Sequence, residues 1–315
     1  MQALEFEKTI LEVEDKIEEL RHMSSSEELD VVEEMKRLET KLKKQVSLAY
    51  KKLTPLQKTQ VARHENRPHT TDYIHALITD FIPLCGDRCF AEDEAIITGM
   101  GRFQGRTVMI MGHEKGRDME SRLKHNFGAA RPEGYRKVSR LLKMAERFGI
   151  PVISFVDTAG AFPGVEGEER GQAEAIATAM DVSFDLTVPV IAVIIGEGGS
   201  GGAIAMATAN TVLMLSNSIY SVISPEGCAS ILWKDATKAD KAAMSLCLTV
   251  EDLLKHKIVD EEIKEPLGGA HRYPKETIMA VGTALGNALK SFDSMTGEII
   301  KKSRQNKFLQ MTRNG

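Results

Sequence analysis

The sequence predicts an α/β protein in which parallel strands alternate with helices. Two short apolar runs, Val188 to Ile195 and Pro151 to Val156, are rich in Val and Ile, which is typical of strands buried on both faces of a parallel sheet. Each run leads into a glycine-rich turn, and helical stretches follow at Ala203 to Ala209 and Glu168 to Met180. The carboxyl ends of parallel strands meet at one edge of a sheet, so we expect both turns to lie there and to form a ligand site.

The turn at 196–202 reads GEGGSGG and contains five glycines in seven residues. Backbone without side chains can approach a ligand closely, and the amides that open a following helix bind anions. The turn satisfies G-x-G-x-x-G, but a dinucleotide site also has an acidic residue at the end of the next strand. That strand, about Val212 to Leu215, ends instead in Ser216 and Asn217.

Three further interpretations apply to the same turn. A P-loop requires Lys and then Ser or Thr after its last glycine, and the sequence here continues with Ala203 and Ile204, which excludes it. G-x-S-x-G fits with Ser200 as a nucleophile, and His256 and His271 downstream leave that hypothesis open. The last is an oxyanion hole built from backbone amides, which requires no particular side chain. The second glycine turn favours it, because amides from two loops can flank one oxygen.

The N-terminal residues predict a helical hairpin. Apolar residues recur at intervals of four and three, as in the seam of a coiled coil, and Ser24-Ser25-Ser26 separates the two helices. Ser25 and Glu28 form a capping box for the second helix. The seam residues are Phe6, Ile10, Val13, Ile17 and Leu20, followed by Val31, Met35, Leu38 and Leu42. We expect the hairpin to pack on the main domain or on a partner and to carry no chemistry.

Residues 90–115 change to a strand pattern. Ile96 to Phe103 and Thr107 to Gly112 are joined at Gln104-Gly105, a hairpin turn signal. A basic segment follows, and a helix that begins near Pro132 presents its positive end there. The segment either binds an anion or is a solvated surface. Its basic residues are Lys115, Arg117, Arg122, Lys124, Arg131, Arg136, Lys137 and Arg140.

The C-terminal third contains three further helices. Ser224-Pro225-Glu226-Gly227 follows a strand at Tyr220 to Ile223 and opens a short helix with Pro in its first turn. That helix either donates amides to a site or caps itself. Helices at Lys275 to Ser291 and Met295 to Lys302 carry an apolar face that we expect to pack against the core or a second copy.

Composition and charge narrow the class of protein. With 315 residues and 42% hydrophobic content, the chain is long enough for one large domain and an appendage, and a net charge of −4 gives no reason to expect nucleic acid. The charged opening MQALEFEKTI is unlike a secretory signal, and no apolar run approaches the ~20 residues that span a membrane, so we expect a cytoplasmic protein. Cys85 and Cys89 have C-x3-C spacing without a second pair, and neither they nor Cys228 and Cys247 predict a metal site.

Several ordered runs that include both glycine turns resemble the carboxyltransferase alpha subunits of bacterial-type acetyl-CoA carboxylase. The longer runs are DTAGAFPGVEGEERG at 157–171, GEGGSGGA at 196–203, SVISPEGCASILW at 221–233 and EPLGGAH at 265–271, with shorter ones at 86–88, 112–116 and 132–137. Together they extend over nearly the whole chain. One difference is Ala159, where the family commonly has Pro.

The resemblance implies a crotonase/Clp-like spiral of ββα units. It divides the chain into an N-terminal helical arm at 1–35, a carboxyltransferase domain at 36–292 and a C-terminal helical tail at 293–315. It also implies a biotin-dependent carboxyltransferase that is active only with a beta subunit, as an α2β2 heterotetramer. Carboxybiotin, presented on the biotin carboxyl carrier protein and formed by biotin carboxylase, gives its carboxyl group to acetyl-CoA, and malonyl-CoA leaves for fatty acid synthesis. No cofactor is covalently bound to this chain, and zinc belongs to the beta subunit.

The resemblance also implies where the site lies. Transfer builds negative charge on the ureido oxygen of biotin and on the thioester oxygen of acetyl-CoA, and backbone amides of both turns suit these charges. No side-chain base is required, because the released biotin takes the methyl proton. The candidate donors are Gly198, Gly199, Gly201 and Gly202 in one turn and Gly160, Ala161 and Gly164 in the other. The candidate substrate-binding residues are Arg131, Glu133, Gly134, Arg136, Lys137, Pro225, Glu226 and Gly227.

Two alternatives remain beside this interpretation. A serine peptidase of the Clp type shares the superfamily and would use Ser200 as its nucleophile. A non-catalytic acyl-CoA-binding scaffold would keep the fold without the reaction.

Overall fold

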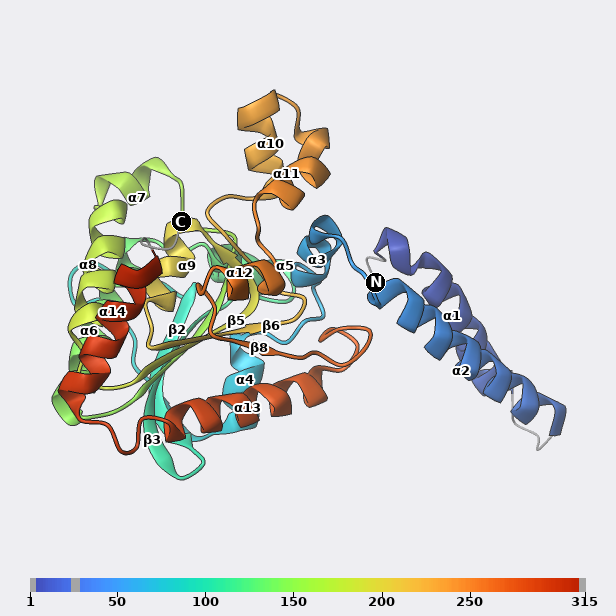
Figure 1. Cartoon of the computed structure of the whole chain (residues 1–315), viewed down its shortest axis with the longest axis horizontal. Coiled ribbons are helices and arrows are strands. Elements are labelled where there is room, and N and C mark those ends of the chain that lie inside the picture. The colour runs from blue at the N-terminus through green and yellow to red at the C-terminus, as the bar shows by residue number, and fades with distance from the viewer. Residues whose placement is uncertain (1–3, 24–28, 312–315) are drawn as a thin grey trace.

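The computed structural model describes residues 4–23 and 29–311 and contains a mixed eight-stranded sheet with helices on both faces (Figure 1). The strand order is β1-β2-β3-β4-β5-β6-β8, and β7 pairs with β5 farther along that strand. The pairs β1-β2 and β2-β3 are antiparallel, and the others are parallel. The strands are β1 (Ile78–Pro83), β2 (Ile96–Phe103), β3 (Arg106–His113), β4 (Val152–Thr158), β5 (Val190–Gly199), β6 (Thr211–Leu215), β7 (Ile219–Ser221) and β8 (Glu261–Ile263).

Helices α6, α8 and α9 cover one face of the sheet, with α14 beside α8, and α4 and α13 cover the other face (Figure 1). The α-helices are α1 (Lys8–Met23), α2 (Leu29–Tyr50), α3 (Pro55–Ala62), α4 (Thr70–Leu77), α5 (Met119–Lys124), α6 (Pro132–Phe148), α7 (Val165–Glu169), α8 (Gln172–Asp185), α9 (Ser200–Ala207), α10 (Pro225–Trp233), α11 (Ala239–Ser245), α12 (Val250–Lys255), α13 (Pro274–Lys290) and α14 (Gly297–Met311). The short 3-10 turns are η1 (Glu5–Glu7), η2 (Asn126–Gly128) and η3 (Ala236–Lys238).

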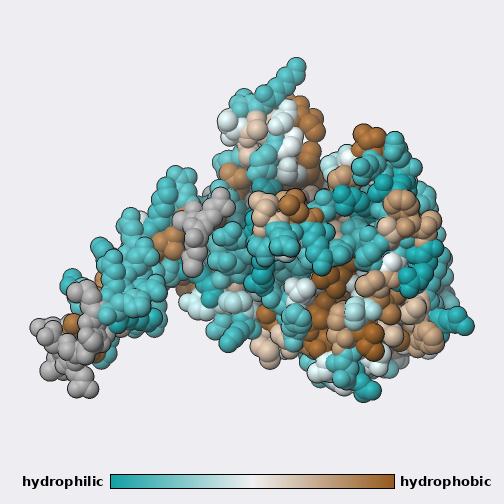
Figure 2. All heavy atoms as spheres, turned by 180° about the vertical axis from the view of Figure 1, so that it is seen from behind, coloured by the Kyte–Doolittle hydropathy of each residue, from teal (hydrophilic) through white to brown (hydrophobic). Residues whose placement is uncertain are grey.

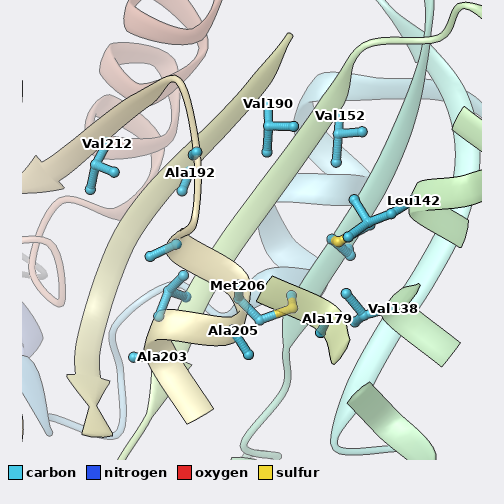
Figure 3. Close-up of a cluster of buried hydrophobic side chains, with 14 of the residues drawn as sticks. Val138, Leu142, Val152, Ala179, Val190, Ala192, Ala203, Ala205, Met206 and Val212 are labelled. Atoms are coloured by element: carbon cyan, nitrogen blue, oxygen red, sulfur yellow. The ribbon is translucent and has the colours of Figure 1, made fainter. Parts of the chain in front are cut away.

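The apolar run in β5 is continuous because its two faces belong to two different cores. Ala192 and Ile194 pack beneath α6, α8 and α9, whereas Ile191 and Val193 pack against α4 and α13. Figure 3 shows the first of these cores, in which Met206 of α9 lies among side chains of the sheet and of α6 and α8. This confirms the predicted α/β class with strands buried on both faces.

The predicted β-hairpin is confirmed. Strands β2 and β3 pair from Ile96 with His113 to Phe103 with Arg106, and the turn between them is Gln104-Gly105. Both turn residues have positive φ, 49° and 81°, as a two-residue turn between twisted strands requires.

The N-terminal helices α1 and α2 pack together and project from the body as an arm (Figure 1). Their predicted seam is buried at Ile10, Val13 and Ile17, and Figure 2 shows an outer surface that is mostly hydrophilic. Helix α2 runs unbroken across residue 35, the expected end of the arm, to Tyr50. The serine break at 24–26 and the Ser25–Glu28 capping box lie outside the described residues.

Several predicted boundaries are wrong. Strand β5 continues through Gly199, and α9 begins at Ser200 instead of Ala203, because β7 and the end of β4 supply backbone partners for the glycine-rich residues. The helix predicted from Glu168 to Met180 is two helices, since Gly171 has φ 80° and interrupts it. Helix α14 continues to Met311, well beyond the expected end.

Within the part of the chain that the structure describes, none of the helices combines the length and apolar character needed to cross a membrane.

Candidate active site

The two glycine turns lie side by side at the carboxyl ends of β4 and β5. Thr158 of β4 pairs with Gly198 of β5, and on its other edge β5 pairs with β7 through Gly198 with Tyr220 and Gly199 with Ser221. Helix α9 begins at the next residue, Ser200. The sheet therefore brings the turn after β4 against the junction of β5 and α9, which is the arrangement that the sequence predicts.

Two glycines make this close approach possible. A Cβ atom on Gly199 would overlap the carbonyl group of Ala159. A Cβ atom on Gly202 would stand 2.8 Å from the backbone nitrogen of Ala161 and 2.8 Å from the hydroxyl oxygen of Tyr135. A side chain at either glycine would come too close to the turn after β4, so the two turns pack backbone against backbone.

Gly201 differs from its neighbours. A Cβ atom placed on it would meet only the Ile176 side chain, at 3.5 Å, which is ordinary van der Waals contact. Space alone therefore does not require glycine at this position, although the sequence alone suggests the same role for Gly201 and Gly202.

The first turn of α9 carries backbone N–H groups that the helix itself leaves without acceptors. The N–H groups of Ser200, Gly201 and Gly202 have no acceptor within the helix, because they belong to its first turn. Ser200 has a φ of 52° and an exposed side chain. In the opposing turn, the N–H of Gly160 donates to the Thr158 hydroxyl at 3.1 Å, and Gly160 has a φ of 151°. The Gly160 amide is thus already engaged, and the residue serves the shape of the turn.

An apolar groove of about 640 Å³ opens beside the start of α9. Ser200 and Gly201 lie at its wall, and Phe308 and Met311 of the C-terminal helix α14 form part of another wall. Its other apolar lining includes Ile204, Ala207, Val212, Tyr220, Val222, Leu246, Leu253 and Ile258, with Lys255, His256 and Lys257 also contributing. A groove of this size and character suits a small ring system or an acyl chain.

A chain of charged side chains lies next to the two turns. The Lys115 ammonium contacts Asp157 Oδ1 at 2.7 Å and Glu197 Oε2 at 2.8 Å. Arg63 donates to Glu197 Oε1 at 2.6 Å and also to Glu226 of α10 at 2.8 Å. Burial acts to raise the pKa of Glu197, but the charges of Lys115 and Arg63 outweigh it and hold that pKa at about 2. Glu197 is therefore ionised at neutral pH.

Most of the predicted substrate-binding residues on α6 are engaged inside the protein. Glu133 is buried and accepts from Arg136 at 2.9 Å and from Arg170 at 2.8 Å. Lys137 is also buried, and its ammonium donates to Glu92 and to the carbonyl oxygens of Asp93 and Ile96. These side chains tie α6 to neighbouring loops.

The other predicted site residues are divided between two places. Arg131 is half-buried, and its guanidinium lies 4.5 Å from the centre of the Phe162 ring, in the turn after β4. Gly134 is buried in the first turn of α6, and Gly164 caps α7 against the same Phe162 ring. Pro225 and Gly227 stand in the first turn of α10, where the Gly227 N–H is taken by Ser224. Helix α10 therefore caps itself, and Glu226 links it to Arg63.

The sequence does not single out Arg63, Lys115, Asp157 and Glu197 as a group. Asp157 directly follows the apolar run 151–156, and Glu197 is the second residue after the run 188–195, so an acidic residue near the end of each strand was a usable signal. Arg63 and Lys115 gave no such signal, because they reach the site from loops 134 and 82 residues away from Glu197.

The fold is similar to that of two solved structures with which the chain shares little sequence identity. Transcarboxylase 12S, solved with methylmalonyl-coenzyme A and methylmalonic acid bound, aligns over 71% of this chain and 42% of its own, at 20% identity and a TM-score of 0.57. A Pseudomonas malonate decarboxylase heterotetramer in complex with coenzyme A aligns over 70% and 88%, at 14% identity and a TM-score of 0.56.

Sequence comparison defines the family. The model for acetyl co-enzyme A carboxylase carboxyltransferase-like proteins matches residues 3–312, and the chain belongs to this family. The acetyl-coenzyme A carboxylase carboxyl transferase subunit alpha of Paramagnetospirillum magneticum is 58% identical over 315 residues, which are 100% of this chain and 99% of the relative. The subunit of the same name from Rhodospirillum centenum is 54% identical over the same shares.

Proposed function

We propose that this chain is the alpha half of an acetyl-CoA carboxyltransferase. It moves a carboxyl group from carboxybiotin, held on a carrier protein, to acetyl-CoA and so forms malonyl-CoA for fatty acid synthesis. The observation that carries the proposal is the convergence of two glycine turns and the first-turn amides of α9 beside an apolar groove. The relatives named as acetyl-CoA carboxylase subunits support the choice of substrate.

The groove fits the ring system of biotin, because its walls are apolar while the α9 amides at one wall offer donors to a polar oxygen. When bound there, carboxybiotin supplies an activated carboxyl group. The amides of Gly201 and Gly202 stabilise the negative charge that develops on the ureido oxygen, and the positive end of α9 adds to that stabilisation. These groups are fixed before the reaction, so no reorganisation is required when charge appears.

We assign the turn after β4 to the second oxygen, that of the thioester. Its donor is the amide of Ala161, since the Gly160 amide already binds Thr158. Gly160 and Gly164 shape this turn, and Gly198 and Gly199 shape the other. Arg131, next to Phe162, is the residue of the basic segment that we propose contacts substrate, whereas Glu133, Arg136 and Lys137 hold α6 in place.

The chain works as part of a complex. Its relatives are named as alpha subunits, which supports a beta subunit as the partner. We propose an α2β2 heterotetramer that receives the biotin carboxyl carrier protein after biotin carboxylase has acted, with any zinc held by the beta subunit. We also propose the cytoplasm as its compartment, because Cys85, Cys89, Cys228 and Cys247 are all free thiols.

The test is reconstitution. The chain and the beta subunit from the same organism are purified separately, and decarboxylation of malonyl-CoA in the presence of biotin is followed as release of acetyl-CoA. We expect negligible turnover from either chain alone and robust turnover from the mixture. Absence of turnover from a stable complex would contradict the proposed reaction, and full turnover from the chain alone would contradict the shared site.

The geometry of Ser200 favours a second candidate function, that of a serine hydrolase. Ser200 combines an exposed side chain with a φ of 52° at a turn from strand to helix, as nucleophilic serines of G-x-S-x-G motifs do, and His256 lines the same groove. A fluorophosphonate probe distinguishes the two functions, because it labels an activated serine and leaves a carboxyltransferase unlabelled.

A further inference from the structure

The ammonium group of Lys115 joins the two strands that carry the glycine turns. Lys115 follows β3, which pairs with β4, and its side chain reaches past β4 to β5. It contacts Asp157 Oδ1 at 2.7 Å and Glu197 Oε2 at 2.8 Å. The two carboxylates are 7% and 9% exposed, and Lys115 itself is 19% exposed, so water screens this bridge only weakly.

The bridge lies where the ladder between β4 and β5 is irregular. The register shifts between Val156 and Thr158, so Asp157 stands at the shift. Its Oδ1 also accepts the backbone N–H of Glu197 at 2.9 Å. A single carboxylate oxygen thus receives both the Lys115 ammonium and the backbone of β5, and the shifted register depends on polar contacts in place of a regular ladder bond.

Backbone packs closely against the bridge on two sides. A Cβ atom on Gly196 would lie inside contact distance of the Asp157 carboxylate, and one on Gly128 would stand 2.9 Å from Lys115 Cγ and 3.0 Å from the Asp157 carbonyl oxygen. Backbone therefore confines Lys115 and Asp157 on two sides. Lys115, Asp157 and Glu197 also line a cavity of about 580 Å³.

Charge balance makes Lys115 necessary. Burial acts to lower the pKa of Lys115, but Asp157 and Glu197 raise it above its ordinary value, so the residue carries its charge. Without the ammonium, Asp157 and Glu197 would face each other as buried carboxylates, and Arg63 would remain paired with Glu197 and with Glu226 of α10. Two carboxylates close enough to share one ammonium repel each other in a poorly screened site, and we expect the ends of β4 and β5 to move apart.

We propose that Lys115 is a positioning residue that sets the spacing of the two glycine turns, and through it the spacing of the two sets of amide donors. The proposal rests on the carboxyltransferase function proposed above. Lys115 touches no substrate in this role. It acts through Asp157, three residues before Gly160, and through Glu197, one residue before Gly198.

The test compares Lys115→Met with Lys124→Met in the reconstituted complex. Lys124 is the matched control, since it lies nearby in the same basic segment and makes a single exposed ion pair with Glu94 at 2.9 Å. We expect Lys115→Met to lower kcat about 10²-fold, because displaced donors stabilise the transition state poorly. The KM for malonyl-CoA should stay within about twofold, since ground-state binding does not use the bridge. Lys124→Met should match the wild type.

Chemical rescue separates positioning from a general loss of structure. Lys115→Cys is purified as a folded complex and treated with 2-bromoethylamine, whose carbon-bromine bond is displaced by the thiolate to form an aminoethyl thioether and bromide. The product restores an ammonium at nearly the length of lysine. Treated wild type controls for the native cysteines. We expect kcat to return to within about threefold of treated wild type, since the ammonium is the group that holds the turns.

The outcomes are distinct. Wild-type kcat in Lys115→Met, or in untreated Lys115→Cys if the Met variant does not fold, would overturn the positioning role. A low kcat that modification of Lys115→Cys leaves unchanged would overturn it as well. Failure of the wild-type complex to turn over malonyl-CoA contradicts the carboxyltransferase function instead, so the two failures are distinguishable.

Discussion

Thr158 on β4 lies directly beside Gly198 on β5 as its partner in the parallel ladder. The preceding pair is Val156 with Ile194, so β4 advances two residues between these pairs while β5 advances four. The additional length in β5 falls at Gly196 and Glu197 and carries the following glycines against the turn after β4. A change in register, rather than a long loop, therefore forms the candidate site.

The first prediction separates two glycines that the sequence treats alike. Gly202→Ala should lower kcat of the reconstituted complex about 10²-fold, because its methyl group would collide with Ala161 and Tyr135 and push the two turns apart. Gly201→Ala is the matched control and should keep kcat within about threefold, since its methyl group meets only the Ile176 side chain. Steady-state kinetics at saturating substrate measures both.

If Gly201→Ala and Gly202→Ala show equal kcat while both complexes assemble normally, the packing of the two turns does not control the donors.

The second prediction concerns the hydroxyl of Ser200. Ser200→Ala and Ser200→Gly both remove it, and both should retain most carboxyltransferase activity because the proposed donors are backbone amides. Loss of a nucleophile would instead lower activity about 10⁴-fold or more. Since Ser200 has a φ of 52°, Ser200→Gly should also stabilise the protein by up to about 1 kcal/mol. Inactivity of both variants would favour the hydrolase.

The third prediction is a loss of stability in mild acid. Burial, aided by the charge of Lys115, lowers the pKa of His113 to about 3, and burial also lowers the pKa of His64 to about 4. In the unfolded chain both imidazoles titrate near pH 6.5. The unfolded state therefore binds more protons below pH 6.5, and stability should fall with pH from 6.5 toward 4.

His113→Leu removes one of the two imidazoles and therefore one of the protons that the unfolded chain binds below pH 6.5. The free energy of unfolding of this variant should decline less steeply than that of the wild type between pH 6.5 and 5, by about 1.4 kcal/mol per pH unit. Urea denaturation at a series of pH values measures the slope. His22→Gln is the control, because His22 is exposed on α1 and its replacement should leave the slope unchanged. Parallel slopes for wild type and His113→Leu would show that His113 does not contribute.

The sequence predicts the local elements of this fold well because their signals are local. The strands β2 and β3, the Gln104-Gly105 turn and the start of α6 near Pro132 each depend on neighbouring residues, and the structure confirms all three. The break between α7 and α8 could not be foreseen in the same way, because Gly171 also fits a continuous helix until its backbone conformation is known.

The buried ion pairs join residues far apart in the sequence, and for that reason the sequence does not predict them. Arg67 and Glu265 form a buried bidentate pair between residues 198 positions apart, and Glu265 also accepts the backbone N–H of Asn217. The sequence marks Glu265 only as part of the EPLGGAH run. Its partner becomes visible only when the sheet has brought these loops together, and the same holds for Lys115 with Glu197.

A fully buried arginine fixes the C-terminal helix to the body. The guanidinium of Arg304 in α14 donates to the carbonyl oxygens of Ser183, Leu186 and Val188 at 2.6 to 2.8 Å, and to Asn210 Oδ1 at 2.5 Å. Burial lowers its pKa to about 10, so it remains charged at neutral pH. Four acceptors thus depend on this one side chain, and loss of the guanidinium would leave buried carbonyl groups without a donor.

Arg304→Met should therefore lower the free energy of unfolding by about 3 kcal/mol or more, since several hydrogen bonds to a charged donor are lost together. Because Phe308 and Met311 of the same helix line the apolar groove, the variant complex should also show a raised KM for biotin with a smaller change in kcat. Lys302→Met, an exposed change on the same helix, is the control and should leave both quantities unaltered. Denaturation curves and biotin titrations measure the two effects. An Arg304→Met variant that loses stability but keeps the wild-type KM for biotin would show that α14 supports the fold without forming the biotin site.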